Sequence, residues 1–134
     1  MDIFLVDTSV WINFLKGRET KSSLFLKNNL NSIIIATCPV IVQEVLQGVS
    51  SEMEFRKVNS HFISLTKLIG EPYELAYDAA KLYREIRKNG FTIRKPNDCL
   101  IACYAIANRV KLLHDDIDFH YISLNSDLMV QSIE

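Results

Sequence analysis

Four acidic residues that are far apart in the chain are candidates for one metal site: Asp7, Glu44, Asp98 and Asp116. Two carboxylates about 4 Å apart repel each other by roughly 4 kcal/mol at an effective dielectric constant of about 20, so a cluster of them needs a bound cation. Oxygen ligands favour Mg²⁺ or Mn²⁺, which usually keep several waters and also bind phosphate oxygens of a substrate. The four acids therefore predict a metal-dependent site for a phosphodiester, where the metal polarises a phosphate oxygen and helps to generate hydroxide from water.

Each acid also has a purely structural interpretation. Asp7 could cap the helix that follows it, Asp98 could complement the dipole of its own helix, and Glu44 could be an ordinary exposed glutamate. Asp98 fits this interpretation least well, because Asn97 beside it is already a good cap and the helix it introduces is strongly apolar. For each residue alone the structural interpretation is preferable, and the metal-site hypothesis depends on the whole set meeting in space.

The apolar pattern of the first half predicts strands and helices that could bring these acids together. Ile3 to Val6 is a short run with β-branched members, typical of a buried parallel strand, and Asp7 follows it directly. The next elements are expected to be a helix, a second helix and a strand: Val10 to Lys16, Leu24 to Leu30 and Ile33 to Ala36. Glu44 then lies beside the wetter face of a helix that opens at Pro39.

The second half is predicted to be mostly helical, with helices over Ser51 to about Leu68, Tyr73 to Asn89 and Cys99 to Ala107. The last of these has no polar side chain except the hydroxyl of Tyr104, so it should be buried on nearly all sides, and Asp98 stands at its entrance. Val110 to Leu113 is expected to be a third strand that leads into an acidic run. Tyr121 to Leu124 is a possible fourth strand.

Strands that alternate with helices predict an α/β sandwich with a mainly parallel sheet. In such folds, binding sites form beyond the carboxyl ends of the strands. Asp7 follows the first strand and Asp116 the third, while Glu44 and Asp98 are expected in the first turns of helices that begin at the same edge. All four carboxylates can therefore converge.

The length and composition indicate one domain. A chain of 134 residues that is 49% hydrophobic can close one core but not two, so residues 1–134 are expected to form a single domain. The longest apolar stretch, Ile33 to Val42, is interrupted by Thr37 and Pro39 and is far shorter than the roughly 20 residues that span a bilayer. The first residues lack the features of a secretory signal. We therefore expect a cytoplasmic protein without a membrane segment.

The three cysteines, Cys38, Cys99 and Cys103, argue against a disulfide framework, because they are odd in number and lack paired spacing. A zinc site formed by Cys99 and Cys103 with His114 and His120 can be considered. Both cysteines fall in an apolar helix, however, where a free cysteine usually acts as a small hydrophobe.

The net charge of −1 does not by itself favour a polyanionic partner. Between Lys81 and Lys95, however, six basic residues accompany the single acid Glu85, so a local positive face can form. A solvated helix face would explain this segment equally well. The candidates for contact with a nucleic acid are Arg84, Lys88, Arg94 and Lys95.

Four segments resemble those of PIN-domain proteins: DTSVWI from Asp7 to Ile12, the helical Glu44, NDCLIA from Asn97 to Ala102, and LLHDDIDF from Leu113 to Phe119. The similarity extends over essentially the whole chain. The size of the chain and the order of its motifs match the toxin ribonucleases of VapBC toxin-antitoxin operons. This resemblance implies a three-layer α/β/α sandwich and a Mg²⁺- or Mn²⁺-dependent endoribonuclease in which metal-activated water hydrolyses RNA.

The resemblance also implies a role for each member of the acidic set. Asp7 and Asp98 would be the main metal ligands, and Glu44 would hold or activate a metal-bound water. Asp116 would complete the metal site or support its ligands, and Thr8 would orient Asp7.

The last motif leaves its register open, because Asp115, Asp116 and Asp118 crowd together and any of them could complete the site. His114 departs from the family pattern, in which a hydroxyl residue such as Thr or Ser more often precedes the acidic pair. A histidine beside three acids is more often a hydrogen-bonded structural residue than a ligand or a base.

The family further implies a homodimer and a cognate VapB-like antitoxin that inserts a segment into the acidic groove. The helices expected over Leu24 to Leu30 and Ser51 to Leu68 could supply contact surfaces or belong to the core. One alternative is a non-catalytic or housekeeping PIN-type module that binds RNA. Another is a phosphoryl-transfer or receiver-type protein, which is disfavoured because Lys111 precedes the third strand, at the wrong edge of the sheet.

Overall fold

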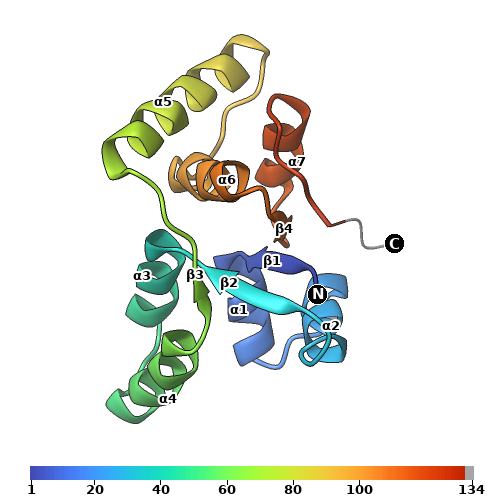
Figure 1. Ribbon diagram of the computed structural model, residues 1–134, viewed down its shortest axis with the longest axis vertical. Coiled ribbons are helices and arrows are strands. Elements are labelled where there is room, and N and C mark those ends of the chain that lie inside the picture. Colours follow the sequence, from blue (N-terminus) through green and yellow to red (C-terminus); the bar gives the residue numbers. More distant parts are fainter. Residues whose placement is uncertain (132–134) are drawn as a thin grey trace.

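The computed structural model describes residues 1–131, which form a four-stranded sheet between two layers of helices (Figure 1). The elements follow in the order β1 (Ile3–Val6), α1 (Thr8–Leu15), α2 (Lys21–Asn28), β2 (Ile34–Thr37), α3 (Pro39–Gln47), α4 (Glu52–Ile63), β3 (Thr66–Lys67), α5 (Pro72–Lys88), α6 (Asn97–Asn108), β4 (Lys111–Leu113) and α7 (Ile117–Leu124). Helices α6 and α7 cover one face of the sheet, and α1 and α2 cover the other. The predicted α/β/α sandwich is confirmed.

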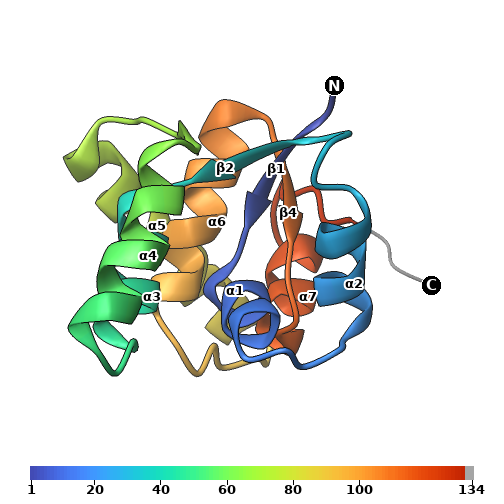
Figure 2. The same cartoon turned by 90° about the horizontal axis from the view of Figure 1, so that it is seen from below.

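The sheet has the strand order β3-β2-β1-β4, and all neighbouring strands are parallel. Leu5 of the central strand β1 lies opposite Ala36 of β2 and Leu112 of β4, and all three side chains are fully buried. A short, continuously apolar strand suits a position that is covered on both faces. In Figure 2, β1 and β4 run from the top of the picture toward α1 and α7, so their carboxyl ends share one edge.

The possible strand at Tyr121–Leu124 is a wrong prediction, because these residues form the last part of α7. The carboxylate of Asp116 caps this helix, and its buried residues Phe119 and Ile122 are three positions apart, which is helical spacing. Aromatic and β-branched residues favour strands only weakly when packing demands otherwise.

The helix predicted from Ser51 to about Leu68 is too long, since α4 ends at Ile63. After it, Thr66 and Lys67 pair with Ala36 and Thr37 as the edge strand β3. This strand has two exposed residues and no apolar alternation, so the sequence carries no pattern that would predict it.

No helix within residues 1–131 combines the length and apolar character that a bilayer-spanning segment requires.

Cys38, Cys99 and Cys103 are buried and free, and burial raises the pKa of Cys99 to about 12. The cysteines therefore pack as small hydrophobic residues, as predicted.

Candidate active site

Three carboxylates stand at the starts of three helices near the carboxyl ends of β1 and β4. Asp7 caps α1, Asp98 is the second residue of α6, and Asp116 caps α7. The first turn of a helix offers unpaired N–H groups and the positive end of the helix dipole, both of which favour a carboxylate. The structural interpretation is thus partly correct for Asp7 and Asp98, and Asp116 is a helix cap as well. The three side chains are nevertheless only 3%, 4% and 8% exposed. The interactions at the helix starts alone do not compensate for the contacts with water that these carboxylates lose on burial.

Carboxylate oxygens of Asp98, Asp116 and Asp118 lie within 4.8 Å of one another. Asp118, in the first turn of α7, is only 2% exposed. Within residues 1–131 this is the one group of three or more aspartate, glutamate, histidine or cysteine side chains that is close enough to hold a metal ion. The cluster therefore joins two of the predicted acids with Asp118, whose place in the site the sequence left open.

Asp115 turns away from this cluster. It is exposed, and its carboxylate accepts hydrogen bonds from Nδ2 of Asn13 at 2.9 Å and Oγ1 of Thr20 at 2.7 Å. Of the three crowded acids, Asp116 and Asp118 therefore face the cluster, whereas Asp115 ties the loop to α1 and the start of α2.

His114 has a hydrogen-bonding role beside the cluster. Its Nδ1 accepts a hydrogen bond from the backbone N–H of Asp116 at 3.2 Å, and its ring lies 5.3 Å from that of Phe119. Burial lowers the pKa of His114, which favours the neutral ring that this hydrogen bond requires. The geometry agrees with a structural residue rather than a metal ligand.

Asp7 is held by Ser9, a contact that the sequence did not predict. Oδ2 of Asp7 accepts hydrogen bonds from the backbone N–H of Ser9 at 3.0 Å and from its hydroxyl at 2.6 Å. The hydroxyl of Thr8 donates to Oε1 of Glu44 at 2.8 Å, so the side chain of Thr8 orients Glu44, and its role toward Asp7 stays a prediction. Glu44 is the sixth residue of α3, not in its first turn as predicted, and reaches the edge through this bond.

The electrostatics tie Asp7, Glu44 and Asp98 to one site. Burial raises the pKa of Asp98 to about 8, and the charges of Asp7 and Asp116 add to this effect. Burial also raises the pKa of Asp7 to about 6 against the opposing bonds from Ser9, and the charge of Glu44 contributes to the rise. These carboxylates are close enough to repel one another, as a site that binds a cation requires.

Two oxygens of the site have no hydrogen-bond partner: Oδ1 of Asp7 and Oδ2 of Asp98, both buried. A buried acceptor without a partner costs about 1–3 kcal/mol, and more when it is charged. Each of these oxygens is therefore available as a ligand for a divalent cation. The donor set consists of carboxylates, which suits the hard ions Mg²⁺ and Mn²⁺ better than zinc.

The loop between α5 and α6 brings two cations to the other side of the cluster. Nη2 of Arg94 lies 2.9 Å from Oδ1 of Asp116, and Nε lies 3.5 Å from Oδ1 of Asp118. Nζ of Lys95 lies 3.3 Å from Oδ2 of Asp116. Burial alone would raise the pKa of Asp116, but the N–H of Asp118 and the cations Lys95 and Arg94 together lower it.

The four basic candidates differ in their ion pairing. Arg94 and Lys95 are engaged with the acids, whereas Arg84 and Lys88 are exposed on α5 and make no ion pair within residues 1–131. The sequence indicated the basic segment but not that its last two residues enter the acidic cluster.

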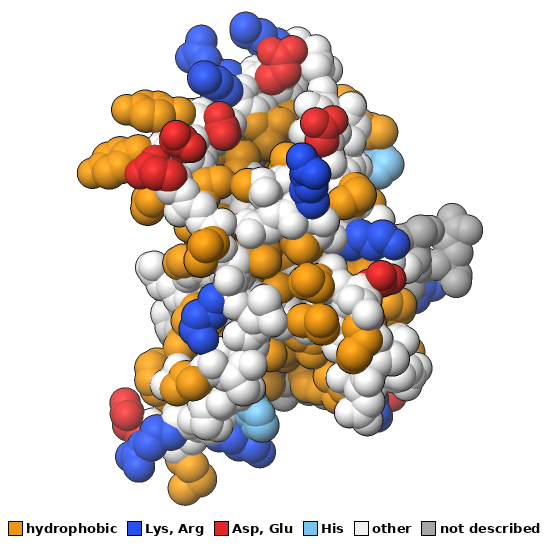
Figure 3. Space-filling view, viewed as in Figure 1, with side chains coloured by type: hydrophobic (Ala, Val, Ile, Leu, Met, Phe, Trp, Pro, Cys, Tyr) orange, Lys and Arg blue, Asp and Glu red, His pale blue; other side chains and the backbone are white. Residues whose placement is uncertain are grey.

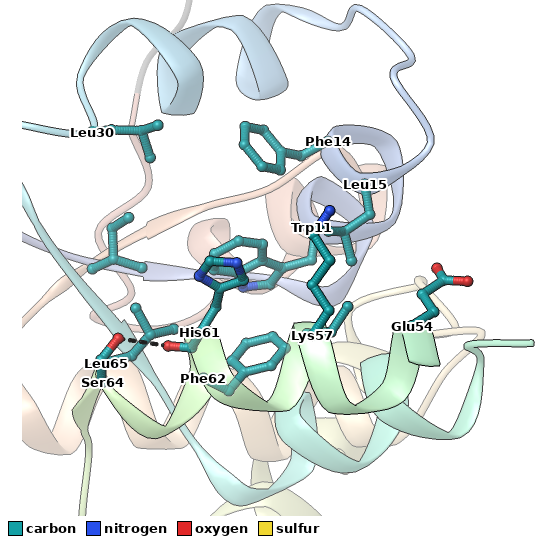
Figure 4. A pocket seen from close by; sticks show the side chains of 12 residues that line it. Trp11, Phe14, Leu15, Leu30, Glu54, Lys57, His61, Phe62, Ser64 and Leu65 are labelled. Carbon is teal, nitrogen blue, oxygen red and sulfur yellow. Dashed lines mark hydrogen bonds between the residues drawn. The ribbon is translucent and has the colours of Figure 1, made fainter. Parts of the chain in front are cut away.

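An apolar groove of about 600 Å³ lies between α4 and the α1–α2 pair (Figure 4). Trp11 and Phe14 of α1 and Phe62 of α4 line it, and the rings of Trp11 and Phe62 are 5.1 Å apart. Lys57 and His61 also border the groove. The groove shares no lining residue with the acidic cluster and is a second candidate binding surface.

Comparisons with known proteins agree with this architecture. Residues 4–124 match the family model of the PIN domain. VapC ribonuclease Mb1587 of Mycobacterium bovis and ribonuclease VapC11 of Mycobacterium tuberculosis are each 30% identical over 139 residues, covering 97% of this chain and 98% of the relative. The solved structure of VapBC-1 from nontypeable Haemophilus influenzae has a TM-score of 0.72 at 20% identity, covering 97% of both chains.

Proposed function

The chain belongs to the PIN-domain family, and on that premise we propose that it is a metal-dependent endoribonuclease, the VapC-type toxin of a toxin-antitoxin pair, with one nuclease domain over residues 1–134. The observation that carries the proposal is the convergence of buried carboxylates from three helix starts, with one unpaired oxygen on Asp7 and one on Asp98. The ribonuclease names of the relatives and the toxin-antitoxin complex among the structural neighbours support the substrate and the class. The cytoplasm would be its location.

In this proposal Asp7 and Asp98 hold a Mg²⁺ or Mn²⁺ ion, and Asp116 completes the acidic wall beside Asp98. The ion, when bound, supplies Lewis-acid polarisation of a phosphate oxygen and acidifies water. Glu44, held by the hydroxyl of Thr8, accepts the proton of the attacking water. Arg94 and Lys95 keep Asp116 ionised and add positive charge near the phosphodiester.

The direct test is cleavage of single-stranded RNA by the purified protein with Mg²⁺ or Mn²⁺ and with EDTA. We expect cleavage with either ion and none with the chelator. Binding of RNA without cleavage under all conditions would instead favour the non-catalytic module. Cleavage without growth arrest on expression in a bacterial host would favour a housekeeping nuclease over a toxin.

Replacing Thr8 by valine is expected to slow RNA cleavage by about tenfold, because residues that orient groups at a metal site typically contribute 10- to 100-fold. The change keeps the shape of the side chain but removes the hydroxyl that donates to Glu44. Initial rates at saturating Mg²⁺ measure the effect. Thr66→Val, on the exposed edge strand β3, is the matched control and should cleave at the wild-type rate. Equal rates for both variants would show that this hydroxyl does not position Glu44.

The apolar groove between α1 and α4 would receive the antitoxin. Its lining includes Leu30 and Leu65, which belong to the two segments that the sequence indicated as possible contact surfaces. A further segment of the antitoxin would enter the acidic cluster.

Replacing Leu30 by glutamate should weaken the complex with the antitoxin by about tenfold, because burying a charge in the groove costs more than 1 kcal/mol. Calorimetric titration with the purified cognate antitoxin measures the affinity. Leu124→Glu, on an exposed position of α7, is the matched control. Unchanged affinity of the Leu30 variant would place the antitoxin elsewhere.

A homodimer is part of the same proposal. Ile69, Tyr73 and Tyr77, around the start of α5, are exposed by 78%, 72% and 65% and offer an apolar surface for a second copy. Figure 3 shows apolar side chains that stand out beside acidic ones on the α5 side of the molecule. Light scattering coupled to size-exclusion chromatography tests this assembly, and a monomer at high concentration would contradict it.

A further inference from the structure

The cations of the chain divide the acidic site into two halves. Asp116 and Asp118 are both paired with Arg94. Asp7 and Asp98 each keep one buried oxygen without a hydrogen-bond partner. The unpaired oxygens mark the half that needs a metal ion, while Arg94 and Lys95 together balance the charges of Asp116 and Asp118.

Arg94 is fixed to Asp116 and Asp118 through both its side chain and its backbone. Its guanidinium contacts both carboxylates, and its backbone N–H donates to Oδ2 of Asp118 at 3.0 Å. Ion pairs between exposed groups contribute little, but these two carboxylates are 8% and 2% exposed and depend on their partners for compensation. Removing the guanidinium would leave Asp118 without a side-chain ion pair within residues 1–131, and Asp116 with Lys95 alone.

The loop that carries Arg94 is also attached to the rest of the molecule. Ile93 is 2% exposed, and the ring of Phe91 stacks on Tyr121 of α7 with centroids 4.4 Å apart and planes at 19°. Nδ2 of Asn89 donates to Oδ1 of Asn125 at 2.6 Å. The backbone of Arg94 therefore cannot leave the cluster without breaking contacts with α7.

A second metal ion beside Asp116 and Asp118 would meet these cations at short range. Like charges repel more strongly as they approach, and a divalent ion doubles the repulsion that a monovalent ion would meet. The oxygens that such an ion would need are already used by Arg94 and Lys95. Binding a second ion would require displacement of the guanidinium.

We propose that Arg94 occupies the place of a second divalent cation, so that the site binds one metal ion, held by Asp7 and Asp98. This inference rests on the metal-dependent function proposed above. Arg94 is then a positioning residue that supplies a permanent positive charge at the metal site. A residue that only held RNA would not need its contacts with Asp116 and Asp118.

The test counts bound Mn²⁺ ions per chain, using the electron paramagnetic resonance signal of free Mn²⁺ during titration of the full-length protein without RNA. The wild-type protein should bind one ion per chain, and Arg94→Gln should bind two, because the neutral amide releases Oδ1 of Asp116 and Oδ1 of Asp118 from the guanidinium. Two ions in the wild-type protein would overturn the inference, as would a single ion in the variant.

Two controls complete the experiment. Arg56→Gln removes the same charge from an exposed position on α4 and should leave one ion per chain. The side chain of Arg94 is 66% exposed, so its variants should fold; if circular dichroism shows that Arg94→Gln does not, Arg94→Met replaces it as the neutral variant. The ion count is made without RNA and is therefore independent of the cleavage assay. An unexpected number of ions would overturn this inference but not the proposed function, and absence of RNA cleavage would overturn the proposed function whatever the number of ions.

Discussion

Replacing Asp98 by asparagine is expected to reduce RNA cleavage by about a hundred- to a thousandfold while the protein stays folded. The amide keeps the size of the side chain but removes the negative charge of the carboxylate. Oδ2 of this carboxylate has no hydrogen-bond partner within residues 1–131 and is available to a metal ion. Loss of a metal ligand removes several kcal/mol of charge stabilisation in the transition state, and each 1.36 kcal/mol is about tenfold in rate. Initial rates with single-stranded RNA across a range of Mg²⁺ concentrations measure the loss.

The matched control for this change is Asp2→Asn, which alters an exposed aspartate beyond the amino end of β1, at the opposite edge of the sheet. It should cleave RNA at the wild-type rate. If Asp98→Asn also cleaves at that rate, the acidic cluster is not the active site. Rescue of the slow variant by high Mg²⁺ would indicate that Asp98 acts through metal affinity.

The sheet and the helix starts could be predicted because local patterns encode them. The apolar run before Asp7 requires a buried strand, and a parallel sheet places the residues that follow such strands at one edge. Asp98 was recognisable as unusual because it introduces a helix with almost no polar side chains. These features depend on residues within a few positions of one another.

The contacts that decide the chemistry join residues distant in sequence and have no local signal. Arg94 meets Asp118 across 24 positions, and Thr8 meets Glu44 across 36. Which of Asp115, Asp116 and Asp118 face the cluster depends on the turn that starts α7, where Asp116 is the cap. Residue spacing alone could therefore indicate the acidic set but not its division into paired and unpaired carboxylates.

The stability of the metal-free protein is expected to fall as the pH rises from 6.5 to 8. The pKa of Asp98 is about 8 in the folded state against its ordinary value of 3.8, so over this range the folded state releases a proton that the unfolded chain has already lost. The folded state binds more protons, and a rising pH therefore favours unfolding. Integrated over this range, the loss is about 1.5 kcal/mol in the free energy of unfolding.

Urea unfolding in EDTA at the two pH values measures this loss, and the range is chosen so that few other groups contribute. Asp7, with a pKa of about 6, is mostly ionised in the folded state above pH 6.5, and the lowered pKa of His114 gives only a small opposite change. Asp98→Asn should remove most of the dependence and make the metal-free protein more stable than the wild type at pH 8. Saturating Mg²⁺ should restore the stability of the wild type at pH 8, because the ion binds the ionised carboxylate. An equal loss in wild type and variant would mean that the titrating group is not Asp98.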